Sequence, residues 1–183
     1  MIEQDLIADF QGGKIFAYPT EAVYGLGCDP DNEQAVMRLL SLKNRPVNKG
    51  LILVAQNYSQ LLPYVDDKSI PMDKRTEIFS SWPGPVTWLL PASSQAPKWI
   101  TGGASLIAVR VSNHPTIQQL CNLFDKPLVS TSANRSSCPA ALSAEQVTTQ
   151  FADNIVLVDG ELGGASKPST IRHGLSGQII RES

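Results

Sequence analysis

The chain has 183 residues, of which 42% are hydrophobic and 17% are charged, with a formal net charge of −2 at pH 7. These values predict one globular domain, residues 1–183, and give no support to a broad, strongly basic nucleic-acid binder. No apolar run approaches the roughly 20 residues needed to cross a bilayer, and the amino terminus carries acids where a secretory signal would carry bases. We therefore expect a cytoplasmic protein without a membrane partner.

Apolar runs of strand length alternate along the chain with segments of helical period. The runs are residues 14–18, 51–55, 86–92, 106–111, 127–131, 154–158 and 178–182, and most are rich in β-branched side chains. Helical spacing appears in residues 33–42 and 115–124. The alternation predicts an α/β fold, and thirteen prolines and thirteen glycines predict irregular connections.

The first candidate site is the segment of residues 18–27, between the first apolar run and a helical segment near Asn32. Ligand sites in α/β sheets gather at the carboxyl ends of strands, where glycines let the backbone approach a ligand. Thr20 and Tyr24 would supply the polar groups. The alternative is a tight strand-to-helix turn capped by Thr20, and the segment alone does not decide between the two.

A second candidate site, residues 43–50, follows a helical segment. It holds Lys43, Arg45 and Lys49, and no carboxylate occurs between Glu33 and Asp66. Such a cluster suits a polyphosphate, because arginine offers a planar fork of donors and lysine a mobile point charge. In isolation it is better explained as a solvated helix terminus, where basic residues oppose the helix dipole.

Arg110 interrupts residues 106–111, which otherwise predict a buried strand. An unpaired buried guanidinium is costly, so it should meet a carboxylate or a phosphate. Asp125 is the only acid between Ile78 and Ala144. We therefore expect a bound anion to compensate the charge of Arg110, although Asp125 or a carboxylate from elsewhere could pair with it.

Small polar side chains end the following strand. Ser130, Ser132 and Asn134 would lie on one side if the strand continued, where they could contact hydroxyl, amide or phosphate groups. The same residues are also typical of a turn or a helix cap. The late segments Lys167–Ile171 and Arg181 are compatible with an ordinary edge strand and tail.

Several common chemistries have no support in the sequence. There is no phosphate-binding G-x-x-x-x-G-K-[ST] loop, no G-x-S-x-G nucleophile elbow and no H-x-x-x-H metal pair. The three cysteines, Cys28, Cys121 and Cys138, lack C-x-x-C spacing, which argues against a disulfide framework and a zinc knuckle. No protein-held metal is expected.

Taken together and in order, the segments PTEAVYGLG, LKNRPVNKG, WPGPVT, AVRVSNHP, VSTSAN and KPSTI, with a late arginine, resemble the YrdC (TsaC) family over essentially the whole chain. The resemblance implies a twisted, mostly open mixed sheet with flanking helices and a concave basic surface. It also implies an L-threonylcarbamoyladenylate synthase, which joins L-threonine, bicarbonate and ATP and releases pyrophosphate. The product serves the modification of tRNA next to the anticodon.

The resemblance also implies residue roles. Catalytic residues would be Lys43, Arg45 and Arg110. Nucleotide-binding residues would be Lys49, Ser132, Asn134 and Arg181. Threonine-binding residues would be Thr20, Tyr24, Ser130 and Ser169. Longer relatives often have threonine in place of Ala22 and histidine in place of Val54, both in the amino-acid pocket, and the frequent N-x-S-G reads Asn134–Ser137 here.

Mg²⁺ is expected as the companion of ATP, and the implied partners are tRNA, TsaB, TsaD and TsaE. Two other classes of function compete with the enzyme. One is a non-enzymatic module that binds tRNA or ribosomal RNA, and the other is a small-ligand sensor without turnover. The cations are few for an RNA module, aromatic residues make up only 7% of the chain, and no common RNA-recognition motif occurs. The joined motifs therefore favour the enzyme.

Overall fold

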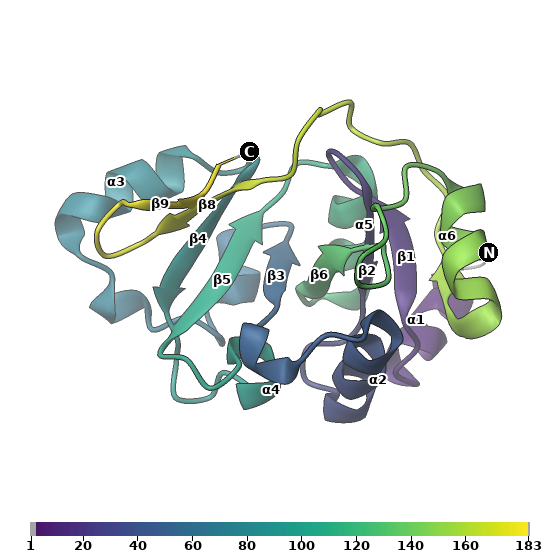
Figure 1. Cartoon of the computed structure of the whole chain (residues 1–183). Helices are drawn as coiled ribbons and strands as arrows, with labels where there is room; N and C mark the ends of the chain where they lie inside the picture. The colour runs from purple at the N-terminus through teal and green to yellow at the C-terminus, as the bar shows by residue number, and fades with distance from the viewer. Residues whose placement is uncertain (1–2, 183) are drawn as a thin grey trace.

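The computed structural model describes residues 3–182, which form one nine-stranded sheet with flanking helices (Figure 1). The strands are β1 (Phe16–Pro19), β2 (Tyr24–Gly27), β3 (Ile52–Ala55), β4 (Val86–Pro91), β5 (Leu106–Val111), β6 (Leu128–Ser132), β7 (Val156–Leu157), β8 (Thr170–His173) and β9 (Ile179–Arg181). The helices are α1 (Glu3–Gln11), α2 (Glu33–Lys43), α3 (Met72–Ser80), α4 (Lys98–Thr101), α5 (Pro115–Phe124) and α6 (Ala144–Phe151). Within residues 3–182, no helix is long and apolar enough to cross a membrane.

The sheet is mixed, as predicted, with strand order β7-β1-β2-β6-β3-β5-β4-β8-β9. Three neighbouring pairs are parallel: β1 with β7, β3 with β5, and β4 with β8. β6 runs antiparallel to both β2 and β3, with Ser132 opposite Gly25 and Ser130 opposite Ile52. This register brings the carboxyl end of β6 to the start of β3, so the two ends can share one site.

Two apolar clusters hold the helices against the sheet. In one, α1 and α5 pack on β1, and the rings of Phe10 and Phe124 stack at a centroid distance of 4.0 Å. The other joins α2 and α6 to strands β2 to β6 and includes the fully buried Trp88 and Leu39. Burial of such large side chains is the main favourable contribution to folding.

Helix α2 confirms the helical period of residues 33–42, and its ends have identifiable causes. The Asn32 side chain accepts a hydrogen bond from Ala35 N at 3.0 Å, which satisfies a free donor of the first turn. Asn44 ends the helix with φ of 53°, a left-handed conformation that asparagine tolerates. The helix therefore stops at Lys43 and leads directly into the basic segment of residues 43–50.

The alternative interpretation of residues 18–27, a tight strand-to-helix turn, does not hold, because Tyr24–Gly27 is a second strand. β1 and β2 form an antiparallel hairpin in which Tyr18 lies opposite Gly25. β6 approaches β2 so closely that a Cβ atom on Gly27 would lie 2.0 Å from Val129 O. Glycine is required here because the neighbouring strand leaves no room for a side chain.

Residues 158–169 contain neither helix nor strand, and we call them the strap. Figure 1 shows the strap in yellow-green, running across the top of the sheet from the β7 side to β8. Long irregular segments are often functional when they are anchored by a rigid scaffold. The strap crosses above the strand ends that carry the candidate residues.

Candidate functional site

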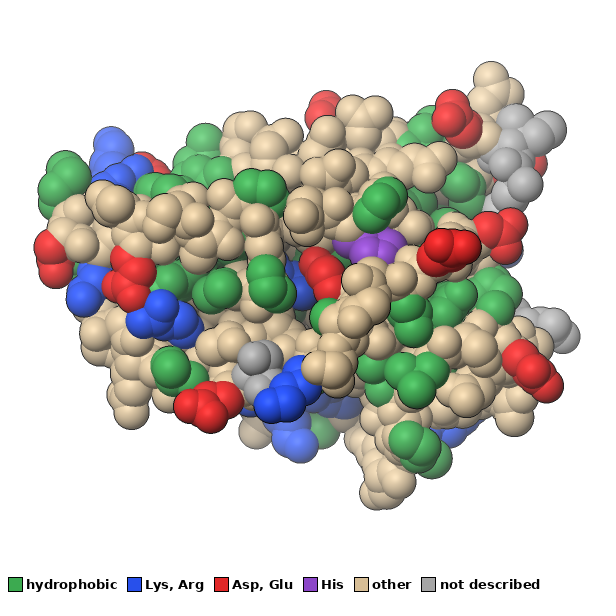
Figure 2. Space-filling view, turned by 90° about the horizontal axis from the view of Figure 1, so that it is seen from above, with side chains coloured by type: hydrophobic (Ala, Val, Ile, Leu, Met, Phe, Trp, Pro, Cys, Tyr) green, Lys and Arg blue, Asp and Glu red, His purple; other side chains and the backbone are tan. Residues whose placement is uncertain are grey.

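A cavity of about 180 Å³ lies where the β1–β2 hairpin, β3, β5, β6 and the end of the strap meet. Its lining comprises residues 20–25, Arg45, Leu51, Ile52, Pro85, Arg110, residues 130–132, residues 167–169 and Arg181. Figure 2 shows a hollow near the middle of this face, where basic, acidic and histidine side chains gather among polar surface. Eight of the eleven predicted site residues line the cavity, and Lys43, Lys49 and Asn134 do not.

The hairpin supplies Thr20 and Tyr24. Thr20 Oγ1 donates to Val23 O at 2.7 Å, and Thr20 N donates to the same carbonyl at 3.1 Å, so the threonine closes the turn. Tyr24 is 6% exposed, and its N donates to Ala141 O at 2.9 Å. Both residues face the cavity from a rigid hairpin, which suits them to positioning a ligand.

The basic segment divides into two parts in the structure. Arg45 lines the cavity, and its Nη2 donates to Gly50 O at 3.0 Å. Burial lowers the pKa of Arg45, and its Nε is buried without a hydrogen-bond partner among the described residues. Lys49 ends the short 3₁₀ helix Val47–Lys49, where it is exposed and lies outside the cavity lining.

Lys43 is buried and turned toward protein oxygens. Its Nζ donates to Ser132 O, to Asn134 O at 2.9 Å and to Asn134 Oδ1 at 3.3 Å. An ammonium group has three donors, and these contacts engage all of them. Burial, and to a lesser degree the neighbouring Arg45, lowers the pKa of Lys43 to about 8. Lys43 therefore holds the end of β6 in place, and its predicted contact with phosphate stays a prediction.

The loop after β6 is hydrogen-bonded to the end of α2. Ser136 Oγ donates to Lys43 O at 2.8 Å, so it satisfies a carbonyl that the helix leaves free. Ser132 Oγ donates to Asn134 Oδ1 at 2.6 Å. Ser137 adopts φ of 70°. A non-glycine residue in this conformation is strained, so Ser137 lowers the free energy of unfolding relative to a glycine at this position.

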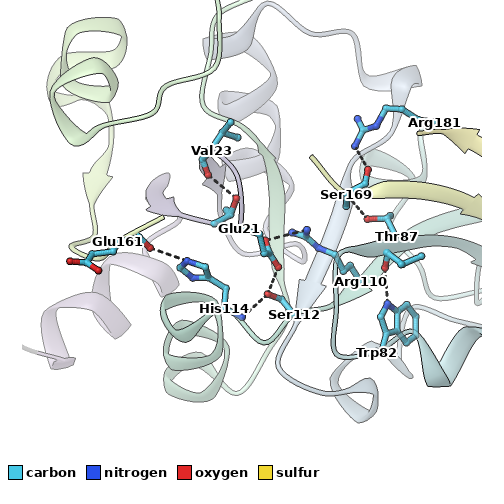
Figure 3. Close-up of polar contacts among 12 residues, drawn as sticks. Glu21, Val23, Trp82, Thr87, Arg110, Ser112, His114, Glu161, Ser169 and Arg181 are labelled. Atoms are coloured by element: carbon cyan, nitrogen blue, oxygen red, sulfur yellow. Dashed lines mark hydrogen bonds and ion pairs between the residues drawn. The ribbon is translucent and has the colours of Figure 1, made fainter. Parts of the chain in front are cut away.

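Arg110 pairs with a carboxylate from elsewhere in the chain, which is one of the alternatives that the sequence leaves open, and not with Asp125. Arg110 Nη1 lies 3.2 Å from Glu21 Oε2, in a pair whose side chains are 8% and 15% exposed. Glu21 is 89 positions away in sequence, so a search for nearby acids finds only Asp125. The hairpin brings this carboxylate to the end of β5, as Figure 3 shows.

The far wall of the cavity is formed by the end of the strap and by Arg181 on β9. Thr87 and Ser169 share a buried hydrogen bond of 2.9 Å between their hydroxyl oxygens. Arg181 Nη2 donates to Ser169 O at 2.9 Å. Burial, together with the charge of Arg110, lowers the pKa of Arg181. The segment that the sequence left as an edge strand and tail therefore completes the cavity.

Sequence reasoning missed the contacts that attach the strap to the hairpin. Gly163 N donates to Thr20 O at 3.0 Å, and Ala165 N donates to Glu21 O at 2.8 Å. His114 Nε2 lies 3.0 Å from Glu161 O. A Cβ atom on Gly163 would lie 2.9 Å from Glu21 Cα, so glycine permits this contact. The glycine-rich composition of residues 160–164 is the only signal of it in the sequence.

The charges of the cavity favour an anionic ligand. Its lining includes four basic residues, Arg45, Arg110, Lys167 and Arg181, and Glu21 is its single acid among the described residues. Serine and threonine hydroxyls line the space between them. Cations and hydroxyls at the end of a sheet are suited to bind carboxylate and phosphate groups.

No group of three or more histidine, cysteine, aspartate or glutamate side chains within residues 3–182 could hold a metal ion. The cysteines are free, and burial raises the pKa of Cys28 and Cys121 to about 12. A thiol with so high a pKa is a poor nucleophile at neutral pH. The cavity lining itself presents basic and hydroxyl side chains.

Residues 9–183 match the family model Sua5_yciO_yrdC, which is described as telomere recombination. A threonylcarbamoyl-AMP synthase of Pseudoalteromonas atlantica is 64% identical over 180 residues, which cover 98% of this chain and 96% of the relative. One of Photorhabdus laumondii is 50% identical over 98% of this chain and 95% of the relative.

The solved structure of Sua5 from P. abyssi complexed with L-threonine superposes with a TM-score of 0.85 at 33% identity, covering 94% of this chain and 52% of Sua5. This chain thus spans about half the length of Sua5. The crystal structure of E. coli YciO, at 21% identity and a TM-score of 0.81, covers 99% of this chain and 90% of YciO and shares the fold.

Proposed function

The chain belongs to the Sua5/YciO/YrdC family, and we propose that it synthesises L-threonylcarbamoyladenylate from L-threonine, bicarbonate and ATP. The observation that carries the proposal is the cavity itself, with four cations, several hydroxyls and one acid at the ends of β6 and β9. Full-length relatives named threonylcarbamoyl-AMP synthase and a Sua5 structure with L-threonine support it.

The reaction joins three anionic species, so its barrier comes largely from bringing them together. The threonine amine attacks the carbon of bicarbonate, and water leaves to give the carbamate. A carbamate oxygen then attacks the α-phosphorus of ATP, and the bond to the β,γ-phosphates breaks to release pyrophosphate. Fixed cations and N–H groups stabilise the charge on the transferring group. No protein nucleophile is needed.

We assign the basic side near β3 to the nucleotide. Arg45 is the cavity residue suited to the phosphates, with Lys49 approaching from outside the lining. Lys43 acts by holding Ser132 and Asn134 at the end of β6, where these two residues face the nucleotide. Such a role agrees with the three hydrogen bonds that Lys43 Nζ donates. To bind a phosphate directly, Lys43 would have to break at least one of these hydrogen bonds.

We assign the opposite side to threonine and its carbamate. Arg110 is the candidate for the amino-acid carboxylate, with Ser130 and Ser169 beside it and Thr20 and Tyr24 on the hairpin. Arg181 is held by Ser169 O and would close over the nucleotide. Ala22 lines the cavity, whereas Val54 is fully buried in the apolar cluster beneath it, so only Ala22 is placed to contact a ligand.

Mg²⁺ would enter with ATP on its phosphate oxygens. The lining offers it one carboxylate, Glu21, whose oxygens already face Arg110 and Ser112. The residues present therefore do not form a dedicated magnesium site, and we derive no step through the ion. We further propose that the product serves tRNA modification in the cytoplasm, in a sequence with TsaB, TsaD and TsaE.

Pyrophosphate release tests this function. The enzyme should release pyrophosphate from ATP only when both threonine and bicarbonate are present, and omission of either should reduce release to background. Release that is independent of threonine would contradict the proposal. Binding of tRNA or ribosomal RNA without any release would instead favour the non-enzymatic RNA-binding module.

A further inference from the structure

Glu21 is the one acid of the cavity lining within residues 3–182, and both of its carboxylate oxygens face polar groups. Oε2 lies 3.2 Å from Arg110 Nη1, and Oε1 accepts a hydrogen bond from Ser112 Oγ at 2.6 Å (Figure 3). Ser112 is fully buried, and its Oγ also accepts from His114 N at 3.0 Å. The carboxylate therefore bridges the cavity arginine to the start of α5.

The main chain of Glu21 is fixed as firmly as its side chain. Ala165 N donates to Glu21 O at 2.8 Å, and the close approach of Gly163 packs the strap against its Cα. Contacts that do not involve Arg110 thus fix both the main chain of Glu21 and its Oε1 atom. The carboxylate can therefore orient the guanidinium that pairs with it.

The contact with Glu21 engages Nη1 of the guanidinium and does not involve Nε. Arg110 Nε is buried and has no hydrogen-bond partner among the described residues, although Arg110 is only 7% exposed and lines the cavity. A buried donor without a partner is costly. Arg110 therefore lines the cavity with hydrogen-bonding capacity that the described residues leave unused.

We propose that Glu21 is a positioning residue, which acts through Arg110 to hold its guanidinium toward the bound amino acid. This inference rests on the proposed function. A planar donor fork binds a carboxylate with two hydrogen bonds only when its plane is fixed, and a displacement of about 1 Å can cost as much as about a hundredfold in rate. Ser112 supports the arrangement by holding the second carboxylate oxygen.

Two variants of Glu21 separate geometry from charge. Glu21→Asp keeps the charge but shortens the side chain, so it cannot contact both Arg110 and Ser112. Glu21→Gln keeps the length but turns a donor toward the guanidinium. We expect KM for threonine to rise about tenfold or more in Glu21→Gln and at least about threefold in Glu21→Asp, with KM for ATP within about twofold of wild type.

Glu161→Gln is the matched control, because it removes one carboxylate from the strap at an exposed side chain outside the cavity lining. Its KM for threonine should stay within about twofold of wild type. If Glu21→Gln does not fold, Glu21→Asp and Ser112→Ala carry the test. Ser112→Ala should raise KM for threonine at least about threefold, because it frees Oε1.

A double-mutant cycle with Arg110→Lys distinguishes positioning from a merely structural role. If Glu21 acts through Arg110, adding Glu21→Gln to Arg110→Lys should change KM for threonine by less than about twofold. Equal effects of Glu21→Gln in both backgrounds would overturn the inference, as would an unchanged or lower KM in Glu21→Asp and Glu21→Gln. Failure of the wild type to form the adenylate would refute the proposed function instead.

Discussion

Replacing Arg110 by Met in the ligand-free protein tests whether the ion pair with Glu21 stabilises the fold. Methionine keeps much of the side-chain volume and removes the cation. Glu21, whose side chain is 15% exposed, would lose its ion-pair partner and keep the hydrogen bond that Oε1 accepts from Ser112 Oγ. Removing one partner of a fully buried pair costs about 3–5 kcal/mol. Because Glu21 keeps Ser112 and reaches the cavity, we expect a loss of about 1–3 kcal/mol.

Thermal and urea unfolding without ligands measure this loss. For a chain of this size the change corresponds to a fall in Tm of about 2–12 °C. The double variant Glu21→Gln/Arg110→Met removes the orphaned charge and should recover at least half of the loss. An Arg110→Met protein as stable as wild type, or more stable, would refute the reasoning, because the ion pair would then contribute nothing to the free energy of unfolding.

Three further perturbations test other parts of the site. Arg45→Ala should impair ATP binding or turnover at least about tenfold, because a charge-assisted contact is worth about 1.5–3 kcal/mol. Lys49 is exposed, so Lys49→Ala should reduce turnover only about threefold, and by less at high salt. Steady-state rates of the two variants test this difference. The pKa of Lys43 is lowered to about 8, so the folded state releases this proton at a lower pH than the unfolded state does. The free energy of unfolding of the wild type, relative to that of Lys43→Met, should therefore rise between about pH 8 and 10.5 in urea melts. A difference between the two proteins that does not change with pH would contradict this. Ser137→Gly should raise the free energy of unfolding by up to about 1 kcal/mol, and a loss would show that φ of 70° carries no strain.

Local sequence signals predicted the scaffold of the fold. The apolar runs of residues 51–55 and 106–111 became β3 and β5, and the helical period of residues 115–124 became α5. The hairpin strand β2 escaped prediction because Tyr24–Gly27 holds two glycines and has little β propensity of its own. Contact with β6, which excludes a side chain at Gly27, makes it a strand.

The candidate site was predictable as a set of residues and not as a set of contacts. Thr20, Arg45 and Ser130 were identified from residue type and spacing, and each lines the cavity. Glu21 was overlooked although it stands beside Thr20, because its partner Arg110 is far away in sequence. The sequence does not reveal the contacts of Lys43, because its burial and its three oxygen partners exist only after α2 meets β6.

The most direct test of the account is the identity of the product. The protein is incubated with ATP, L-threonine and ¹³C-bicarbonate, and the mixture is analysed by mass spectrometry. The account predicts an AMP adduct that contains threonine and one ¹³C atom, together with one pyrophosphate for each adduct formed. Release of pyrophosphate without label in an adduct, or an AMP adduct of threonine that lacks the ¹³C atom, would contradict it.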